Sequence, residues 1–131
     1  MNELKTLLYV DDEPINLKLF AINFKNKFHV LLAGSGFEGL SLLKSTPETH
    51  IVVSDMKMPG MNGIEFIRKA KKDFPEVLYF ILTGFDITED IADALNERII
   101  FKYFRKPFNI KEIEFSIQEA LSKNENEEYE K

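Results

Sequence analysis

The sequence predicts a single α/β domain in which a five-stranded parallel sheet is covered by helices on both faces. Its 131 residues suit one ordinary domain, and 44% of them are hydrophobic, which is enough for a packed core. Five short runs rich in Val, Ile, Leu, Tyr and Phe lack polar alternation, which is typical of strands buried on both faces. Between these runs, apolar residues recur at helical spacing.

The five apolar runs are the expected strands. They are Leu7 to Val10, Val30 to Ala33, Ile51 to Val53, Val77 to Leu82 and Ile99 to Phe101. We extend the third run to about Ser54 and the fifth to about Tyr103, and each interval between strand ends then has room for a loop and a helix. Five such β-then-α units with right-handed crossovers favour a doubly wound, flavodoxin-like sheet of strand order 2-1-3-4-5 with five helices.

Helix starts are marked by residues suited to the first turn. Three pairs place a Ser or Asn three residues before a Glu: Ser35 with Glu38, Asn62 with Glu65, and Asn109 with Glu112. Pro14 suits a first helical turn. By contrast, Ser122 to Lys131 is polar and lacks apolar periodicity. We therefore predict a domain over residues 1–121 and a fraying tail or truncated linker over residues 122–131.

Composition excludes several classes of function. The net charge of −5 disfavours nucleic acid and anionic membranes as partners. The absence of Cys excludes disulfides and thiolate metal sites. The longest apolar run, Val77 to Leu82, is far shorter than the ~20 residues of a membrane-spanning helix, and the segment before Asp11 is too short for a signal peptide. We therefore expect a cytoplasmic protein.

Acidic residues follow two of the predicted strands. Asp11 and Asp12 follow the first strand, and Asp55 follows the third. These strands are neighbours in the predicted order, so the three carboxylates should lie close together and repel one another unless a cation lies between them. Mg²⁺ prefers oxygen ligands and is commonly held by one or two carboxylates plus a phosphate. The pattern therefore predicts a magnesium site.

A hydroxyl and an ammonium group follow the remaining neighbouring strands. Thr83 comes after the fourth strand and Lys106 after the fifth. With a metal ion, these groups would stabilise charge on the equatorial oxygens of a phosphoryl group while Asp55 acts as nucleophile. The predicted product is an aspartyl phosphate.

Four motifs at these positions occur together. They are Asp11-Asp12, the run Asp55 to Gly63, Leu82-Thr83-Gly84 and the run Tyr103 to Phe108. With them, the chain from about Leu7 to Leu121 resembles the response regulator receiver domains of two-component signalling. Singly none of the motifs is specific, but the combination is.

The resemblance implies a phosphoacceptor domain, not an enzyme acting on other substrates. It implies that Asp55 takes a phosphoryl group from a histidine kinase or phosphotransfer protein. It further implies that Asp12, Asp55 and the Lys57 backbone carbonyl bind Mg²⁺, or Mn²⁺ in its place, with Asp11 assisting. Thr83 and Lys106 would hold the phosphoryl group.

The same resemblance implies a conformational switch. Tyr103 matches an aromatic position that, together with Thr83, changes orientation and so alters the surface of the fourth helix, fifth strand and fifth helix. That surface would meet a downstream effector protein or a missing output domain, and a phosphorylation-dependent homodimer stays open. Lys57 and Phe85 lie two residues past Asp55 and Thr83, where we expect them to lengthen the lifetime of the phosphorylated state.

Two other functions are weighed against this one. An aspartate-nucleophile phosphatase would want a second acid two residues after the nucleophile, and Lys57 stands there. A degenerate receiver would act as a binding module without phosphorylation, but Asp55, Thr83 and Lys106 are all present.

Overall fold

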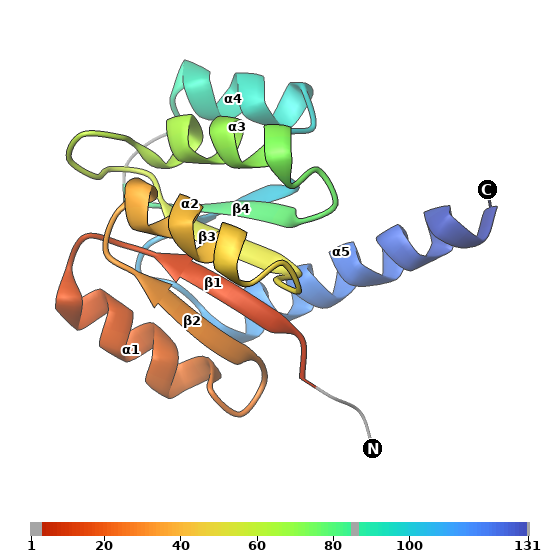
Figure 1. Ribbon diagram of the computed structural model, residues 1–131, viewed down its shortest axis with the longest axis horizontal. Coiled ribbons are helices and arrows are strands. Elements are labelled where there is room, and N and C mark those ends of the chain that lie inside the picture. Colours follow the sequence, from red (N-terminus) through yellow and green to blue (C-terminus); the bar gives the residue numbers. More distant parts are fainter. Residues whose placement is uncertain (1–3, 85–86, 131) are drawn as a thin grey trace.

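The computed structural model describes residues 4–84 and 87–130, with the backbone alone over residues 125–130, as a parallel sheet between two helical layers (Figure 1). Its strands are β1 (Thr6–Val10), β2 (His29–Ala33), β3 (Ile51–Asp55), β4 (Leu78–Thr83) and β5 (Lys102–Arg105). Its helices are α1 (Pro14–Phe24), α2 (Gly36–Ser45), α3 (Gly63–Asp73), α4 (Glu89–Asn96) and α5 (Ile110–Glu130). Strands and helices alternate along the chain, as predicted.

The sheet has the predicted strand order, β2-β1-β3-β4-β5, and every pairing is parallel. The register places Val10 beside Ser54 and Asp55 beside Leu82. The strands that precede the predicted site residues therefore end at the same edge of the sheet. This edge collects groups that lie far apart in the sequence.

Alternate side chains along each central strand pack into two separate hydrophobic cores. On one face, Leu8 and Val10 belong to a cluster with residues of α2, α3 and α4. On the other face, Leu7 and Tyr9 belong to an aromatic-rich cluster with residues of α1 and α5. Because both faces are covered, the central strands are mostly apolar, which is why their sequences show no polar alternation.

Capping residues begin the helices where the sequence predicted. Asn62 and Glu65 form a complete capping box at the start of α3. Ser35 caps α2 by accepting from the Glu38 backbone N–H at 3.1 Å, and Asn109 accepts from the Glu112 N–H before α5.

The predicted fifth strand overlaps β5 but begins too early. The backbone N–H groups of Ile99 and Ile100 bond to the Ala94 carbonyl and so close the end of α4, and the strand begins only at Lys102. Ile100 is buried, but as part of this turn. The short edge strand β5 has an exposed Lys and an exposed Arg at its two ends, so it contains no long apolar run, whereas the turn before it does.

The segment from Ser122 onward, predicted as a fraying tail or truncated linker, has a helical backbone as far as Glu130. Helix α5 continues to Glu130 and projects past the sheet (Figure 1). The segment contains no Pro or Gly, and its Glu and Lys residues have good helix propensity, so a helix continues without an apolar stripe.

Among the described residues, the helices are too short or too polar to span a membrane. This agrees with the short apolar runs of the sequence.

Candidate functional site

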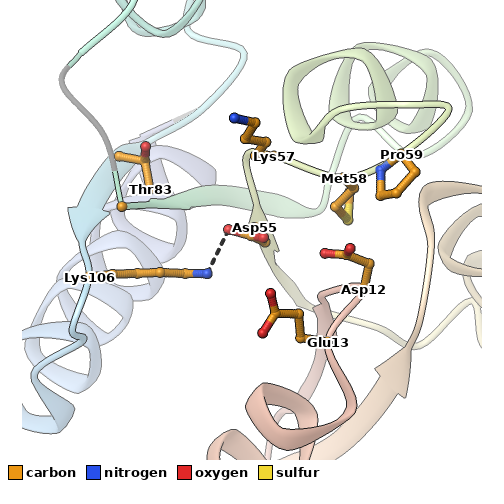
Figure 2. Close-up of a pocket in the computed structure, with 9 residues that line it drawn as sticks. Asp12, Glu13, Asp55, Lys57, Met58, Pro59, Thr83 and Lys106 are labelled. Atoms are coloured by element: carbon orange, nitrogen blue, oxygen red, sulfur yellow. Dashed lines mark ion pairs between the residues drawn. The ribbon is translucent and has the colours of Figure 1, made fainter.

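A cavity of about 520 Å³ opens at the carboxyl ends of β1, β3, β4 and β5 (Figure 2). Its walls combine acidic, basic and hydroxyl side chains with one apolar loop. The lining residues are Asp12, Glu13, Asp55, Lys57, Met58, Pro59, Thr83, Gly84 and Lys106. The predicted topology therefore gathers the predicted strand-end residues around one opening.

Three carboxylates come together at this opening. Asp11, Asp12 and Asp55 each offer one oxygen, and these oxygens all lie within 4.8 Å of one another. Asp11 is fully buried and Asp55 is only 6% exposed, whereas Asp12 is accessible to solvent. Such a group of like charges is unfavourable unless cations neutralise it.

Lys106 supplies positive charge to the carboxylates. Its Nζ lies 2.9 Å from Asp55 Oδ1 and 3.7 Å from Asp11 Oδ2, and Figure 2 shows the side chain extended toward Asp55. Burial lowers the pKa of Lys106, but the hydrogen bond and charge of Asp55 outweigh this and hold the pKa above its ordinary value. Lys106 therefore stays protonated at neutral pH.

Asp55 is held in an environment that disfavours its charge. Burial raises the pKa of Asp55, Lys106 opposes this rise, and the charges of Asp11 and Asp12 add to it. A carboxylate in this state gains more than an exposed one from a nearby divalent cation.

Both oxygens of Asp11 accept hydrogen bonds. The Glu13 backbone N–H donates to Oδ1 at 3.0 Å, and the Tyr9 hydroxyl donates to Oδ2 at 2.7 Å. Burial raises the pKa of Tyr9 far above its usual range, and the bond to Asp11 adds to the rise, so this hydroxyl remains a donor.

Thr83 and Lys57 border the same cavity. Thr83 is the last residue of β4, and its carbonyl accepts the Lys106 backbone N–H at 2.8 Å, which ties the ends of β4 and β5 together. Lys57 follows β3, and its ammonium group points away from Asp55 in Figure 2. Gly84 lines the opening beside Thr83.

Tyr103, the predicted switch residue, does not line the cavity. Tyr103 is half-buried on β5 and packs on the core beneath α2, α3 and α4. Phe85 lies outside the described residues.

Sequence reasoning missed Tyr9 and Glu13 as parts of the site. Tyr9 looks like an ordinary core residue, and only its position two residues before Asp11 on a strand hints that both side chains share a face. Glu13 follows the acidic pair directly, but its role at Asp11 comes from its backbone N–H.

The donor set fits a hard divalent cation. The acids offer only oxygen ligands, which Mg²⁺ and Mn²⁺ prefer, and no Cys occurs in the sequence. Two buried carboxylates share one lysine within the distances given above, so a divalent cation would relieve the remaining repulsion.

Comparison with known families agrees with this geometry. The sequence profile of the response regulator receiver domain matches residues 7–118. The chain belongs to this family. Apart from Thr6 at the start of β1, the match covers all five strands, and it includes the residues that surround the cavity. Residues 7–118 thus form a receiver domain of the kind found in two-component response regulators.

Relatives of the receiver domain range from short to long proteins. Sporulation initiation phosphotransferase F of Bacillus subtilis (strain 168) is 30% identical over 122 residues, covering 92% of this chain and 95% of that protein. The hydrogenase transcriptional regulatory protein HoxA of Cupriavidus necator is 32% identical over 103 residues, covering 79% of this chain but only 21% of that protein. The chain thus spans about a fifth of the length of such longer relatives.

A solved structure has the same fold. A CheY-like response regulator receiver domain protein from Methanospirillum hungatei JF-1 superposes with a TM-score of 0.84 at 30% identity, covering 95% of this chain and 99% of that one. The shared sheet order explains why the strand-end residues can meet at one edge.

Proposed function

We propose that this receiver domain is a phosphoacceptor in which Asp55 takes a phosphoryl group from a phosphohistidine. The observation that carries the proposal is the meeting of three carboxylates and Lys106 beside one open cavity, with Lys106 Nζ 2.9 Å from Asp55 Oδ1. The proposal concerns a signalling domain that catalyses only its own phosphorylation and dephosphorylation.

Transfer would proceed by attack of Asp55 on the phosphorus atom of the donor. A bond forms between an Asp55 oxygen and phosphorus as the phosphorus–nitrogen bond breaks, and the electron pair leaves with the imidazole nitrogen, which takes a proton from solvent. Lys106 is placed to stabilise negative charge on the transferred group, because its ammonium already lies beside Asp55. Thr83, at the adjacent strand end, would donate its hydroxyl to another phosphoryl oxygen.

A divalent cation would complete the site. Asp12, Asp55 and the Lys57 carbonyl are the proposed ligands of Mg²⁺ or Mn²⁺, with Asp11 assisting, and the bound ion would neutralise charge on the phosphoryl oxygens. Without it, the repulsion among the three acids would oppose the approach of a phosphoryl anion.

We propose that phosphorylation is read at the surface formed by α4, β5 and α5. Thr83 pairs in register with Arg105 on β5, and Ile81 pairs with Tyr103, so a shift at Thr83 would reach Tyr103 through two neighbouring strands. The half-buried Tyr103 packs on the core that includes α4. This surface would bind an effector protein, an output domain or a second phosphorylated copy.

Several finer predictions belong to the same proposal. The donor would be a histidine kinase or a histidine phosphotransfer protein in the cytoplasm. Lys57 and Phe85 would lengthen the lifetime of the phosphoryl group. Residues 1–121 would form the receiver domain, and residues 122–131 would serve as a charged tail or as a linker to an output domain.

An intact-mass measurement after incubation with acetyl phosphate and Mg²⁺ tests the proposal. Wild type should gain a single increment of ~80 Da, and chelation of Mg²⁺ should prevent the gain. Asp55→Asn should show no gain. The matched control Asp73→Asn, at the end of α3, should gain the same mass as wild type.

Two results would contradict the proposal. A wild-type mass that stays unchanged would favour a degenerate receiver. Steady release of inorganic phosphate over many turnovers, with no phosphorylated protein, would favour a phosphatase.

A further inference from the structure

The buried Tyr9 hydroxyl joins the aromatic core to the acidic site. Tyr9 lies on β1 and is 1% exposed. Its ring stacks on that of Phe20 in α1, with centroids 4.0 Å apart and planes 4° apart, so the ring has little freedom to turn. From this fixed ring, the hydroxyl donates to Asp11 Oδ2 at 2.7 Å.

Asp11 is thereby held from two sides. Tyr9 holds Oδ2 from the strand, and the Glu13 backbone N–H holds Oδ1 from the start of α1. Asp11 is fully buried, and a buried carboxylate requires such donors to offset its lost hydration. Two donors from different elements fix the plane of the carboxylate as well as its position.

The ammonium group of Lys106 also lies close to Oδ2 of Asp11. Lys106 Nζ lies 3.7 Å from Asp11 Oδ2, beyond a good hydrogen bond, and 2.9 Å from Asp55 Oδ1. Rotation of the Asp11 carboxylate toward Lys106 would tighten that ion pair. A tighter pair with Lys106 would compete with a divalent cation for the charge of Asp11.

We propose that Tyr9 is a positioning residue that orients Asp11 toward the cation site through its hydroxyl. This inference rests on the proposed metal site and adds a residue that the strand-end motifs do not contain. Groups that hydrogen-bond to metal ligands orient them, and their loss typically weakens metal binding by 10- to 100-fold.

Calorimetric titration of the metal-free protein with MgCl₂ at constant ionic strength tests this role. Tyr9→Phe keeps the ring and its stacking on Phe20 but removes the hydroxyl, so it should fold and bind Mg²⁺ about tenfold more weakly than wild type. A thermal melt of each variant checks that it is folded.

Tyr79 provides a matched control on the other face of the sheet. It is also 1% exposed, and its hydroxyl donates to the Phe74 carbonyl at 2.9 Å, away from the acids. Tyr79→Phe removes the same atom from the core and should leave the Mg²⁺ affinity unchanged. A general effect of losing a buried hydroxyl would instead weaken binding in both variants and would overturn the inference.

A double-mutant cycle identifies the group through which Tyr9 acts. In an Asp11→Ala background, Tyr9→Phe should have no further effect on Mg²⁺ affinity, since the carboxylate that it orients is gone. An equal loss in both backgrounds would overturn the inference. If Tyr9→Phe binds Mg²⁺ as tightly as wild type, the inference is overturned but the proposed metal site stands. If wild type binds no Mg²⁺, both the metal site and the role of Tyr9 are refuted.

Discussion

The two ends of the parallel sheet differ in how many buried carboxylates they hold. At the carboxyl ends of the strands, the buried Asp11 and Asp55 lie with Asp12 around one lysine. At the amino ends, hydrogen bonds join the backbones and side chains of neighbouring strands. There the His50 backbone N–H donates to the Thr6 carbonyl at 2.9 Å, and His50 Nδ1 accepts the Thr6 N–H at 3.3 Å.

This difference shows where the domain gives up stability for function. The polar groups at the amino ends of these strands are hydrogen-bonded, whereas like charges lie close together at the carboxyl ends. This crowding of like charges is unfavourable until a cation or phosphoryl group interacts with them. Natural sites commonly retain such unfavourable arrangements where activity requires them. Substitutions at the carboxyl end should therefore separate stability from function, whereas those at the amino end should change stability alone.

The largest expected effect concerns the backbone that surrounds Asp55. A Cβ on Gly63, the first residue of α3, would meet the Asp55 carbonyl oxygen and would lie 2.8 Å from Ile81 Cδ1. Neither a strand backbone nor a buried core side chain can yield easily, so Gly63→Ala should lower the free energy of unfolding by about 2 to 3 kcal/mol. Urea denaturation measures this change.

Gly34 is the matched control for Gly63. It follows β2 at the same edge of the sheet, and a Cβ there would meet nothing within 4 Å. Gly34→Ala should change stability by no more than about 0.5 kcal/mol. Equal losses at the two glycines would show that the edge is not packed tightly around Asp55.

A moderate effect of opposite sign is expected at Asp12. Its charge contributes to the raised pKa of Asp55, so its removal relieves repulsion in the metal-free protein. Asp12→Ala should raise the free energy of unfolding by about 1 kcal/mol without Mg²⁺. With saturating Mg²⁺ the order should reverse, because only the wild type gains stability from tight binding.

The exposed Glu119 on α5 is the control for Asp12, since it is a carboxylate far from the cavity lining. Glu119→Ala should shift stability by less than about 0.5 kcal/mol, with or without Mg²⁺. If Asp12→Ala behaves in the same way, the acids do not repel one another as the geometry indicates.

The smallest effect is expected at the amino end, in the turn before β5. Arg98 adopts φ 60, a left-handed conformation that glycine takes without strain. Arg98→Gly should therefore raise the free energy of unfolding by about 0.5 kcal/mol, the strain relieved being partly offset by a more flexible unfolded chain. Arg98→Ala keeps the strain, so a gain of the same size in that variant would contradict this explanation.

The central strands and their order could be predicted from the sequence because burial on both faces makes those strands mostly apolar. The start of the edge strand β5 was predicted too early, because the strand has exposed charged residues at both ends and an apolar turn lies just before it. Hydrophobic periodicity does not indicate the extension of α5 to Glu130 either, because the last turns of this helix depend on helix propensity and not on an apolar face. Predicting edge strands and the ends of terminal helices therefore requires sequence signals other than hydrophobic runs.

The meeting of Asp11, Asp55 and Lys106 could be predicted because strand order alone brings the ends of their strands together. The contact of Tyr9 with Asp11 could not, because a tyrosine on a buried strand has the same sequence signature whether or not its hydroxyl bonds to an acid. Likewise, only the backbone shows that Arg98, in the turn before β5, takes the left-handed conformation.

Paramagnetic broadening by Mn²⁺ tests most directly whether one cation binds at the carboxyl ends of the strands. In the NMR spectrum of the ¹⁵N-labelled protein, substoichiometric Mn²⁺ should broaden the amide signals of Asp12 and Asp55 first. The signals of His29 and His50, at the amino ends, should stay sharp, and excess Mg²⁺ should restore the broadened signals. Equal broadening at both ends, or none at Asp12 and Asp55, would contradict the proposed site.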